Sequence, residues 1–318
     1  ATGNFALDNG SADLRVTTGQ EGDPGQAATI GLRSAGVITL DSDSSLIAPG
    51  DAGRISINAG TLVVDPDASA TAALVEIAPF AATPVRLPVV SPTGVDFELT
   101  ADDLAAFTTP TLRIGGTMFS GTLVITAAGI QIVNPFAFTG TLDLRSLSTI
   151  AQLSGADLSV GTLAGAAGGA VTLTNAGNAV GSLGDFTAGG PFSLQVTGSL
   201  LTLPVGRTVS AGGTLSIVVL GGSLLVDGTV TGATTFLSAA DGLTVRGFSA
   251  IAASGDLELS GTSVTLAGLA AAAGDIRVLA SGSASLAGRA QTANALRISA
   301  PLTTFGGLDA GSSKDRAN

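Results

Sequence analysis

The sequence of 318 residues contains no histidine, cysteine, tryptophan or tyrosine. Histidine is the commonest general base and metal ligand, so its absence excludes Ser–His–acid and Cys–His nucleophile systems. The absence of cysteine excludes disulfides and thiolate metal sites. Carboxylate chemistry remains open, because sugar-cleaving enzymes built on β-helices use clustered aspartates.

Long apolar runs and basic clusters are also missing. The longest candidates, SIVVLGGSLLV and LAGLAAAAG, contain glycine and stay short of the roughly 18 apolar residues that a membrane helix needs. The net charge is −11, and Lys314 is the sole lysine. Scattered single arginines cannot form a basic patch. We therefore expect neither membrane insertion nor a nucleic-acid partner.

What dominates instead is a repeat of about twenty residues in the C-terminal half. Equivalent apolar positions follow one another at steps of 21, 21, 21, 21, 19 and 20 residues. They are Leu173, Leu194, Leu215, Phe236, Leu257, Ile276 and Leu296. A fixed period filled with strand-forming residues indicates a stack of equivalent coils, each too small to bury its own apolar face. We expect these seven side chains to form one continuous inward row.

Each repeat contains three short strands separated by corners. Apolar residues alternate with small polar ones, as in GTLSI and GDLEL, so one face of each strand points inward. Gly, Asn, Asp and Ser between the strands suit the corners. The N-terminal part repeats the pattern, with Ile55 and Val75 at equivalent positions. The sequence therefore predicts an all-β, parallel β-helix (β-solenoid) of about 20-residue rungs, roughly 16 in number if the whole chain coils.

The middle of the sequence is less regular. Four prolines there cannot donate to a central strand ladder, namely Pro79, Pro84, Pro88 and Pro92. Thr100 follows them and can cap the amides of Asp102 and Asp103, which predicts a short helix. The proline stretch is interpreted as an excursion or an extended segment along an edge.

This irregularity divides the chain into three parts. We expect N-terminal β-helix rungs over residues 1–78 and the proline-rich excursion with its short helix over residues 79–110. Regular β-helix rungs are expected over residues 111–318, where TLRIGG from Thr111 and GTLVIT from Gly121 resume the strand pattern.

Three pairs of aspartates are the candidates for catalysis or metal binding. They are Asp41 with Asp43, Asp65 with Asp67, and Asp102 with Asp103. The first two pairs directly follow strands, where Asp caps turns by bonding its own backbone. The third pair opens the predicted helix, where negative charge is favourable. Calcium at the first two pairs is the alternative, although the GGxGxD repeat of calcium-binding β-rolls is absent.

Other polar residues have structural interpretations. Arg246, Arg277 and Arg297 alternate with apolar residues in strands, so we expect them to point to solvent. Asn175, Asn178 and Asn294 could stack as an interior ladder, but asparagines at corners more often serve the turn. We therefore predict no catalytic, cofactor-binding or metal-binding residue and no cofactor.

Several stretches resemble a known family. Residues 172–206, TLTNAGNAVGSLGDFTAGGPFSLQVTGSLLTLPVG, resemble the repeats of filamentous haemagglutinin-like exoproteins, which two-partner secretion exports in Gram-negative bacteria. VEIAPF, FELTADDLAAFTTPTLRIGG and GTLVIT look like a companion stretch of large members of that group. The resemblance covers roughly residues 28–300.

The resemblance implies a right-handed parallel β-helix outside the cell that works in adhesion, aggregation or biofilm formation. The family's secretion domain carries an Asn-Pro-Asn-Gly-type motif. Only Asn134-Pro135-Phe136 comes near that motif here, in a different place. We therefore expect either a secretion domain outside this chain or a different export route.

The function predicted from these observations is a non-catalytic structural or adhesive segment of a secreted protein on the outer surface of a Gram-negative bacterium. Its partner would be a cell-surface or matrix component, with end-to-end self-association through open strand edges as a further expectation. A self-assembling extracellular filament or sheath subunit is the alternative, followed by a β-helical polysaccharide-degrading enzyme. Binding is expected on the lateral surface or at Pro79–Phe107, unless that segment only covers an apolar face.

Overall fold

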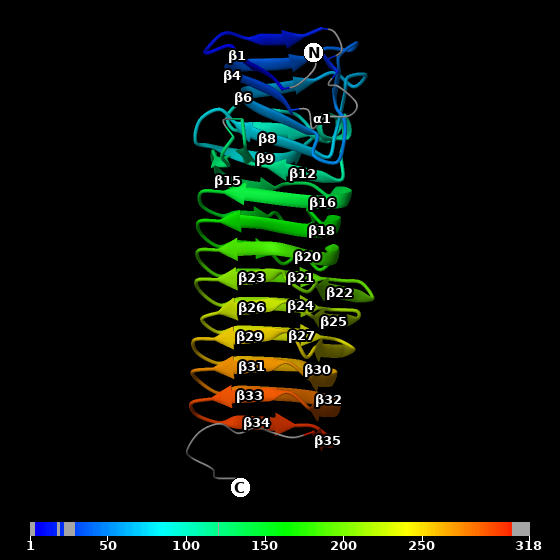
Figure 1. The fold of residues 1–318 in the computed structure, drawn as a ribbon, viewed down its shortest axis with the longest axis vertical. Coiled ribbons are helices and arrows are strands. Elements are labelled where there is room, and N and C mark those ends of the chain that lie inside the picture. Colours follow the sequence, from blue (N-terminus) through cyan, green and yellow to red (C-terminus); the bar gives the residue numbers. More distant parts are fainter. Residues whose placement is uncertain (1–3, 18–19, 22–28, 120, 307–318) are drawn as a thin grey trace. The chain divides into compact units, whose positions relative to one another are not determined.

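The computed structural model describes residues 4–17, 20–21, 29–119 and 121–306. The chain forms two compact units, residues 1–177 and 178–318. Each unit is a β-solenoid in which parallel strands stack turn upon turn (Figure 1), and together the units contain about 14 turns of about 21 residues. The predicted all-β parallel β-helix is therefore confirmed. The turns are fewer than expected because they are slightly longer and because unit 1 carries an inserted hairpin.

Unit 1 contains three runs of stacked parallel strands. Run 1 consists of β1 (Phe5–Asp8), β4 (Thr29–Leu40), β6 (Arg54–Val64), β8 (Leu74–Pro79), β12 (Thr111–Ile114), β16 (Phe136–Ser146) and β18 (Leu158–Ala167). Run 2 contains β2 (Leu14–Val16), paired with β4, and the series β10 (Phe97–Thr100), β9 (Thr83–Val89), β15 (Ala127–Ile132), β17 (Ile150–Gln152) and β19 (Val171–Leu173). Run 3 consists of β3 (Gln20–Glu21), β5 (Ser45–Ala48), β7 (Ser69–Ala72) and β11 (Phe107–Thr108).

The proline-rich stretch lies within run 2, because β9 pairs with β10 on one side and with β15 on the other. Against β15, the register of β9 shifts across Pro84. Against β10, the register of β9 shifts at Pro88, because Glu98 pairs with Arg86 but Thr100 pairs with Val89. The missing N–H groups of both prolines thus fall where the ladder is already irregular. The stretch contributes a strand paired on both sides, in place of the expected edge segment.

The short helix predicted at Thr100 is confirmed as α1 (Ala101–Ala105). The Thr100 hydroxyl accepts a hydrogen bond from the Asp103 N–H at 3.0 Å, and Asp103 Oδ2 accepts from the Thr100 N–H at 2.7 Å. Asp103 also accepts from the N–H of Val64 in β6 at 3.1 Å. This reciprocal capping box satisfies N-terminal amides of the helix and ties it to run 1.

Unit 2 begins with β20 (Ala179–Ala188) and contains three further runs of parallel strands. The first is β21 (Phe192–Val196), β24 (Leu215–Val219), β27 (Thr235–Ala239), β30 (Leu257–Leu266), β32 (Ile276–Leu286) and β34 (Leu296–Ser299). The second is β22 (Leu200–Leu203), β25 (Ser223–Val226), β28 (Gly242–Val245), the later parts of β30 and β32, and β35 (Leu302–Phe305). The third is β23 (Thr208–Ala211), β26 (Thr229–Gly232), β29 (Ala250–Ala253), β31 (Leu269–Ala272) and β33 (Arg289–Thr292).

Two inward rows extend through all six strands of the first run of unit 2. One row is Phe192, Leu215, Thr235, Leu257, Ile276 and Leu296. The other is Leu194, Ile217, Leu237, Leu259, Val278 and Ile298. The expected single row is therefore correct for Leu215, Leu257, Ile276 and Leu296. It is wrong for Leu194, which lies in the second row, and for Phe236, which points outward and is 38% exposed. Leu173 lies in unit 1 and is buried there.

Strand alternation explains the position of Phe236. In the strand TFLSA, burying Phe236 would also bury the Ser238 hydroxyl and expose Leu237. The observed register instead buries Leu237 and Ala239. It places Thr235 in the row, with a buried hydroxyl that has no hydrogen-bond partner.

The register can be tested by truncating one side chain from each class of position. Leu215→Ala should lower the free energy of unfolding by about 2–5 kcal/mol, because it leaves a cavity in a filled row. Phe236→Ala, at the position that the 21-residue spacing places in the same row, should change it by less than about 1 kcal/mol. Chemical denaturation followed by circular dichroism measures both. Equal losses in the two variants would contradict the register.

Candidate functional site: a hairpin over a charged face

Unit 1 departs from the regular coil at a β-hairpin between β12 and β15. Its strands β13 (Gly116–Thr117) and β14 (Val124–Ile125) pair antiparallel. Gly115, with φ of 93°, turns the chain out of run 1, and its carbonyl accepts from the N–H of Thr126 at 3.0 Å. The expectation that GTLVIT resumes the parallel coil is therefore wrong. Alternation alone does not distinguish a hairpin strand from a coil strand.

The hairpin folds back over the outer face of run 1. The Met118 N–H donates to Glu76 Oε2 at 2.9 Å, and the Thr126 hydroxyl donates to the Pro79 carbonyl at 2.5 Å. The Phe119 ring lies directly over Gly31, where an added Cβ would be 2.8 Å from Phe119 Cε2. A side chain at position 31 would therefore displace the Phe119 ring. These contacts pin a segment that would otherwise project into solvent.

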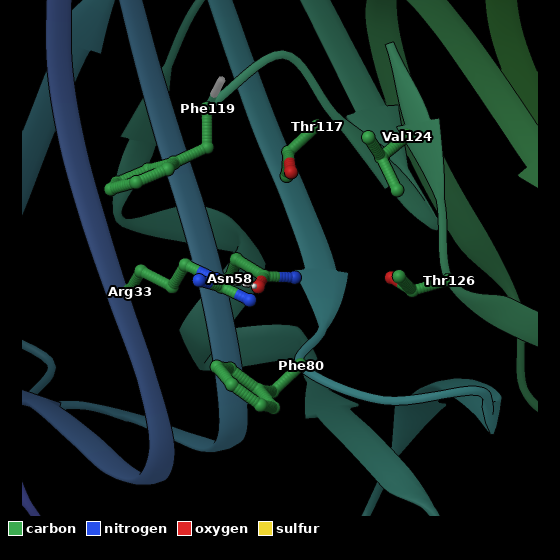
Figure 2. A pocket seen from close by; sticks show the side chains of 7 residues that line it. All are labelled: Arg33, Asn58, Phe80, Thr117, Phe119, Val124 and Thr126. Carbon is green, nitrogen blue, oxygen red and sulfur yellow. Dashed lines mark hydrogen bonds between the residues drawn. The ribbon is translucent and has the colours of Figure 1, made fainter. Parts of the chain in front are cut away.

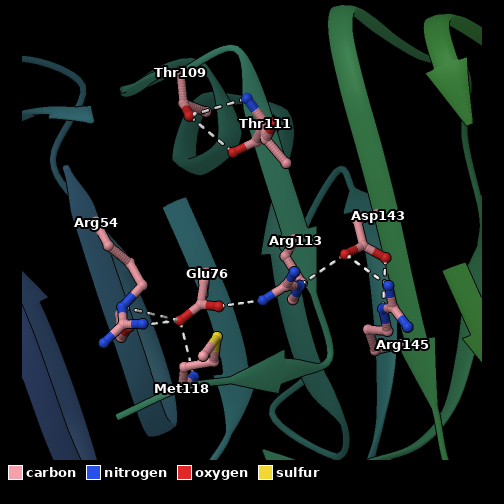
Figure 3. Close-up of polar contacts among 9 residues, drawn as sticks. Arg54, Glu76, Thr109, Thr111, Arg113, Met118, Asp143 and Arg145 are labelled. Carbon is pink, nitrogen blue, oxygen red and sulfur yellow. Dashed lines mark hydrogen bonds and ion pairs between the residues drawn. The ribbon is translucent and has the colours of Figure 1, made fainter. Parts of the chain in front are cut away.

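Alternating charges lie beneath the hairpin. The register of run 1 aligns Ser56, Glu76, Arg113 and Asp143 in one outward column. Arg113 forms ion pairs with Glu76 and, at 2.7 Å, with Asp143. Arg145 pairs with Asp143 at 2.6 Å (Figure 3). Opposite charges at neighbouring positions attract, whereas like charges there would repel.

Glu76 is the centre of this network and its side chain is fully buried. Besides Arg113 and Met118, it accepts from the Ser56 hydroxyl at 2.6 Å and lies 3.8 Å from Arg54 Nε. A buried carboxylate is tolerated only when paired and hydrogen-bonded, and Glu76 meets both conditions. The Asp143 carboxylate is likewise held by two guanidinium groups. Both carboxylates are thus committed to holding the fold and the hairpin in place.

A pocket of about 190 Å³ opens between the hairpin and run 1. Its lining is Arg33, Asn58, Phe80, Thr117, Phe119, Val124 and Thr126 (Figure 2). The guanidinium of Arg33 lies 4.5 Å from the centre of the Phe80 ring. It donates to Asn58 Oδ1 at 3.3 Å and to Asp8 Oδ2 at 2.8 Å. Arg33 is therefore fixed from three sides.

Asp8 keeps its negative charge beside this pocket. The Gly10 N–H, at 3.1 Å, and the Arg33 guanidinium both bind the carboxylate and lower the pKa of Asp8 below its ordinary value. The pair of Asp8 and Arg33 is consequently neutral as a whole. Among the described residues that line the pocket, Arg33 is the only ionisable one.

Another buried carboxylate, Glu98 of β10, organises the loop between β9 and β10. It accepts from the N–H groups of Thr93 and Gly94, from the Thr93 hydroxyl at 2.9 Å and from Arg86 at 3.3 Å. Burial alone would raise the pKa of Glu98, but these donors outweigh it and the net effect lowers the pKa. Gly94 has a φ of 74°, which suits glycine in this turn.

None of the aspartates of the predicted acidic pairs lines the pocket beneath the hairpin. Asp65 accepts from the Asp67 N–H at 3.1 Å, which confirms the turn interpretation for that pair. Asp41 receives a two-pronged bond from Arg15, at 2.7 and 2.9 Å, and its carbonyl accepts from Ser44. The helix interpretation of Asp103 is confirmed by the capping box. Asp43 and Asp102 are exposed.

The remaining sequence expectations concern arginines and asparagines. Arg246, Arg277 and Arg297 are exposed, as predicted. Asn175 donates to the Leu153 carbonyl at 2.8 Å, and the buried Asn178 donates to the Gln195 carbonyl at 3.0 Å. Both asparagines serve backbone carbonyls, and Asn294 is exposed. These two bonds reach carbonyls 22 and 17 residues away rather than the asparagine's own corner, and the exposed Asn294 does not belong to an interior ladder.

The residues of the charged column were not singled out in the sequence. Glu76, Arg113 and Asp143 lie 37 and 30 positions apart, so their contact follows only from the strand register. Among the residues that the structure describes, no group of three or more acidic side chains is placed to hold a metal ion. In the same ranges, no helix has the length and apolar character to cross a membrane.

Comparison of the chain with models of known protein families, with curated proteins and with solved structures gives no match. The resemblance to filamentous haemagglutinin-like exoproteins therefore stays a prediction.

The network beneath the hairpin can be tested by neutralising its centre. Glu76→Gln should destabilise the protein by about 3–5 kcal/mol, because the three guanidinium groups of the largely buried network are then left with one carboxylate, Asp143. Chemical denaturation and proteolysis of the hairpin report the loss. Arg207→Gln removes the exposed pair with Asp185 and is the matched control, with an expected change below about 1 kcal/mol. A loss no larger than that of the control would contradict the role of Glu76.

The lowered pKa of Glu98 predicts a pH dependence of stability. The ionised form is favoured by the fold, so its contribution is fully present above the ordinary value of 4.5 and is lost as the pH falls below it through the folded-state pKa. Glu98→Gln should therefore flatten the fall in melting temperature over that acidic range. Glu258→Gln, at a partly exposed glutamate of β30, is the control and should keep the slope of the parent protein. An unchanged slope in Glu98→Gln would exclude this assignment.

Proposed function

We propose that this chain is a non-catalytic adhesive segment of a surface-exposed extracellular β-solenoid protein. The observation that carries the proposal is the hairpin pinned over run 1, which creates a recessed pocket on the outer surface of unit 1. Apolar side chains fill the interior of each unit, so recognition of a partner has to use the outside. Insertions that project outward are the places where repeat proteins vary this surface.

The charges beneath the hairpin support a recognition role. Buried ion pairs often add less stability than well-packed apolar residues of the same volume. We therefore attribute to these ion pairs the role of fixing the hairpin in one geometry, rather than that of adding stability to the fold. A rigid binding surface loses less conformational entropy when a partner binds. Unit 2 lacks such an insertion among its described residues, and its regular turns suit a spacer.

Adhesion can be tested with beads that carry the purified whole chain. Coated beads should attach to cultured cells or to a polysaccharide-coated surface more strongly than uncoated beads do. Val124→Glu places a charge on the exposed rim of the pocket and should reduce attachment, with the β-sheet circular dichroism spectrum unchanged. Phe248→Ser changes the most exposed phenylalanine of unit 2 and is the control that should attach like the parent. Parent beads that attach no better than uncoated ones would refute the proposal.

A further inference from the structure

We propose that the pocket between the hairpin and run 1 binds one neutral pyranose ring, such as the terminal hexose of a glycan. The proposal deepens the adhesive function and depends on it for its biological meaning. The binding itself is a property of the pocket residues and is tested on the purified chain.

The size of the pocket sets the size of the ligand. A water molecule takes up about 30 Å³ in the liquid, so a pocket of about 190 Å³ equals roughly six waters. A single sugar ring with about a dozen non-hydrogen atoms matches this volume, whereas pockets for drug-sized ligands measure about 300–1,000 Å³. The rim residue Val124 is 47% exposed, so the rest of a glycan can remain in solvent.

Apolar and polar groups alternate around the pocket as they do on a pyranose. Figure 2 shows Phe119 and Val124 across from each other at one end of the pocket and the ring of Phe80 at the other end. The electron-rich face of an aromatic ring attracts the polarised C–H groups on a sugar face. Between these apolar walls lie the hydroxyls of Thr117 and Thr126 and the amide of Asn58. Thr126 and Asn58 already have protein partners, so a purely apolar ligand would leave the Thr117 hydroxyl as the group without one.

Thr117 is the strongest indication of a polar ligand. Its side chain is buried, with 3% exposure, and it lines the pocket. In the part of the chain that the structure describes, its hydroxyl forms no hydrogen bond with a protein group. The hydroxyl is not one of the buried, unpartnered oxygens of the described residues, so it faces the open space of the pocket. A ligand hydroxyl that enters the pocket can donate to Thr117 or accept from it.

The other polar groups are held in place, and the charge balance favours a neutral ligand. Asn58 Nδ2 donates to the Pro79 carbonyl at 2.8 Å, and Asn58 Oδ1 accepts from Arg33. The Arg33 charge is already balanced by Asp8 at 2.8 Å. A carboxylate ligand would compete with Asp8, and an ammonium group would face Arg33. A hexose has neither group.

The test measures binding of methyl hexopyranosides to the whole chain by saturation-transfer NMR and calorimetry. We expect at least one neutral methyl hexoside to bind, with a dissociation constant on the order of millimolar. Phe119→Ala should weaken binding about two- to tenfold through loss of the ring contact. Thr117→Val keeps the side-chain shape and should weaken it by a similar factor through loss of the hydroxyl. Thr141→Val makes the same exchange on run 1 outside the pocket and should bind like the parent.

The outcomes separate this proposal from the adhesive function. Absence of binding by every hexoside overturns the ligand assignment, and so does equal binding by Thr117→Val, Phe119→Ala and the parent. Stronger binding of a methyl glucuronide or of a hydrophobic alcohol than of any neutral hexoside also overturns it. If beads attach while no hexoside binds, only the pocket proposal fails. If hexosides bind while the beads do not attach, only the adhesive function fails.

Discussion

Each unit depends on the hydrogen bonds between parallel strands in successive turns, because they place every side chain beside its counterpart one turn away. In the interior this alignment stacks apolar residues on one another, as with Leu257 and Ile276. On the outer surface, the same alignment requires that side chains in successive turns attract one another or are neutral. The column of Glu76, Arg113 and Asp143 meets this requirement with alternating charge. The same constraint therefore produces both the core and the charged face that holds the hairpin.

The solenoid could be predicted from the sequence because its signal is a repeat of about twenty residues. This period remains recognisable when single positions or turn lengths deviate from it. The register could not be predicted, because a shift by one residue turns a strand over, and the length of each turn varies. Phe236 shows the difference. The repeat spacing predicts that Phe236 lies in the core. The strand instead buries Leu237 and Ala239, and this orientation turns Phe236 outward. Thr100 was predictable because a capping box is local and depends on four consecutive residues.

The candidate site was less predictable because its parts come from distant positions. The hairpin strand LVIT has the same alternation as a coil strand, and only its antiparallel pairing reveals the insertion. The prolines of β9 suggested a break, yet the sheet accommodates Pro84 and Pro88 through shifts of register. Pocket residues such as Arg33 and Thr117 belong to segments that the hairpin brings together. No local pattern marks that contact.

The two units use charge differently, and the difference bears on function. In unit 2, pairs such as Arg207 with Asp185 are exposed, and solvent screening leaves them with little influence on the fold. In unit 1, Glu76 and Asp143 are buried beneath the hairpin, where each needs its guanidinium partners to offset the loss of hydration. Removing one partner would expose the others to that penalty, so the network acts as a unit. A hairpin held in this way keeps Thr117 and Phe119 in fixed positions before any ligand arrives, and such preorganisation makes a small pocket on a repetitive surface selective.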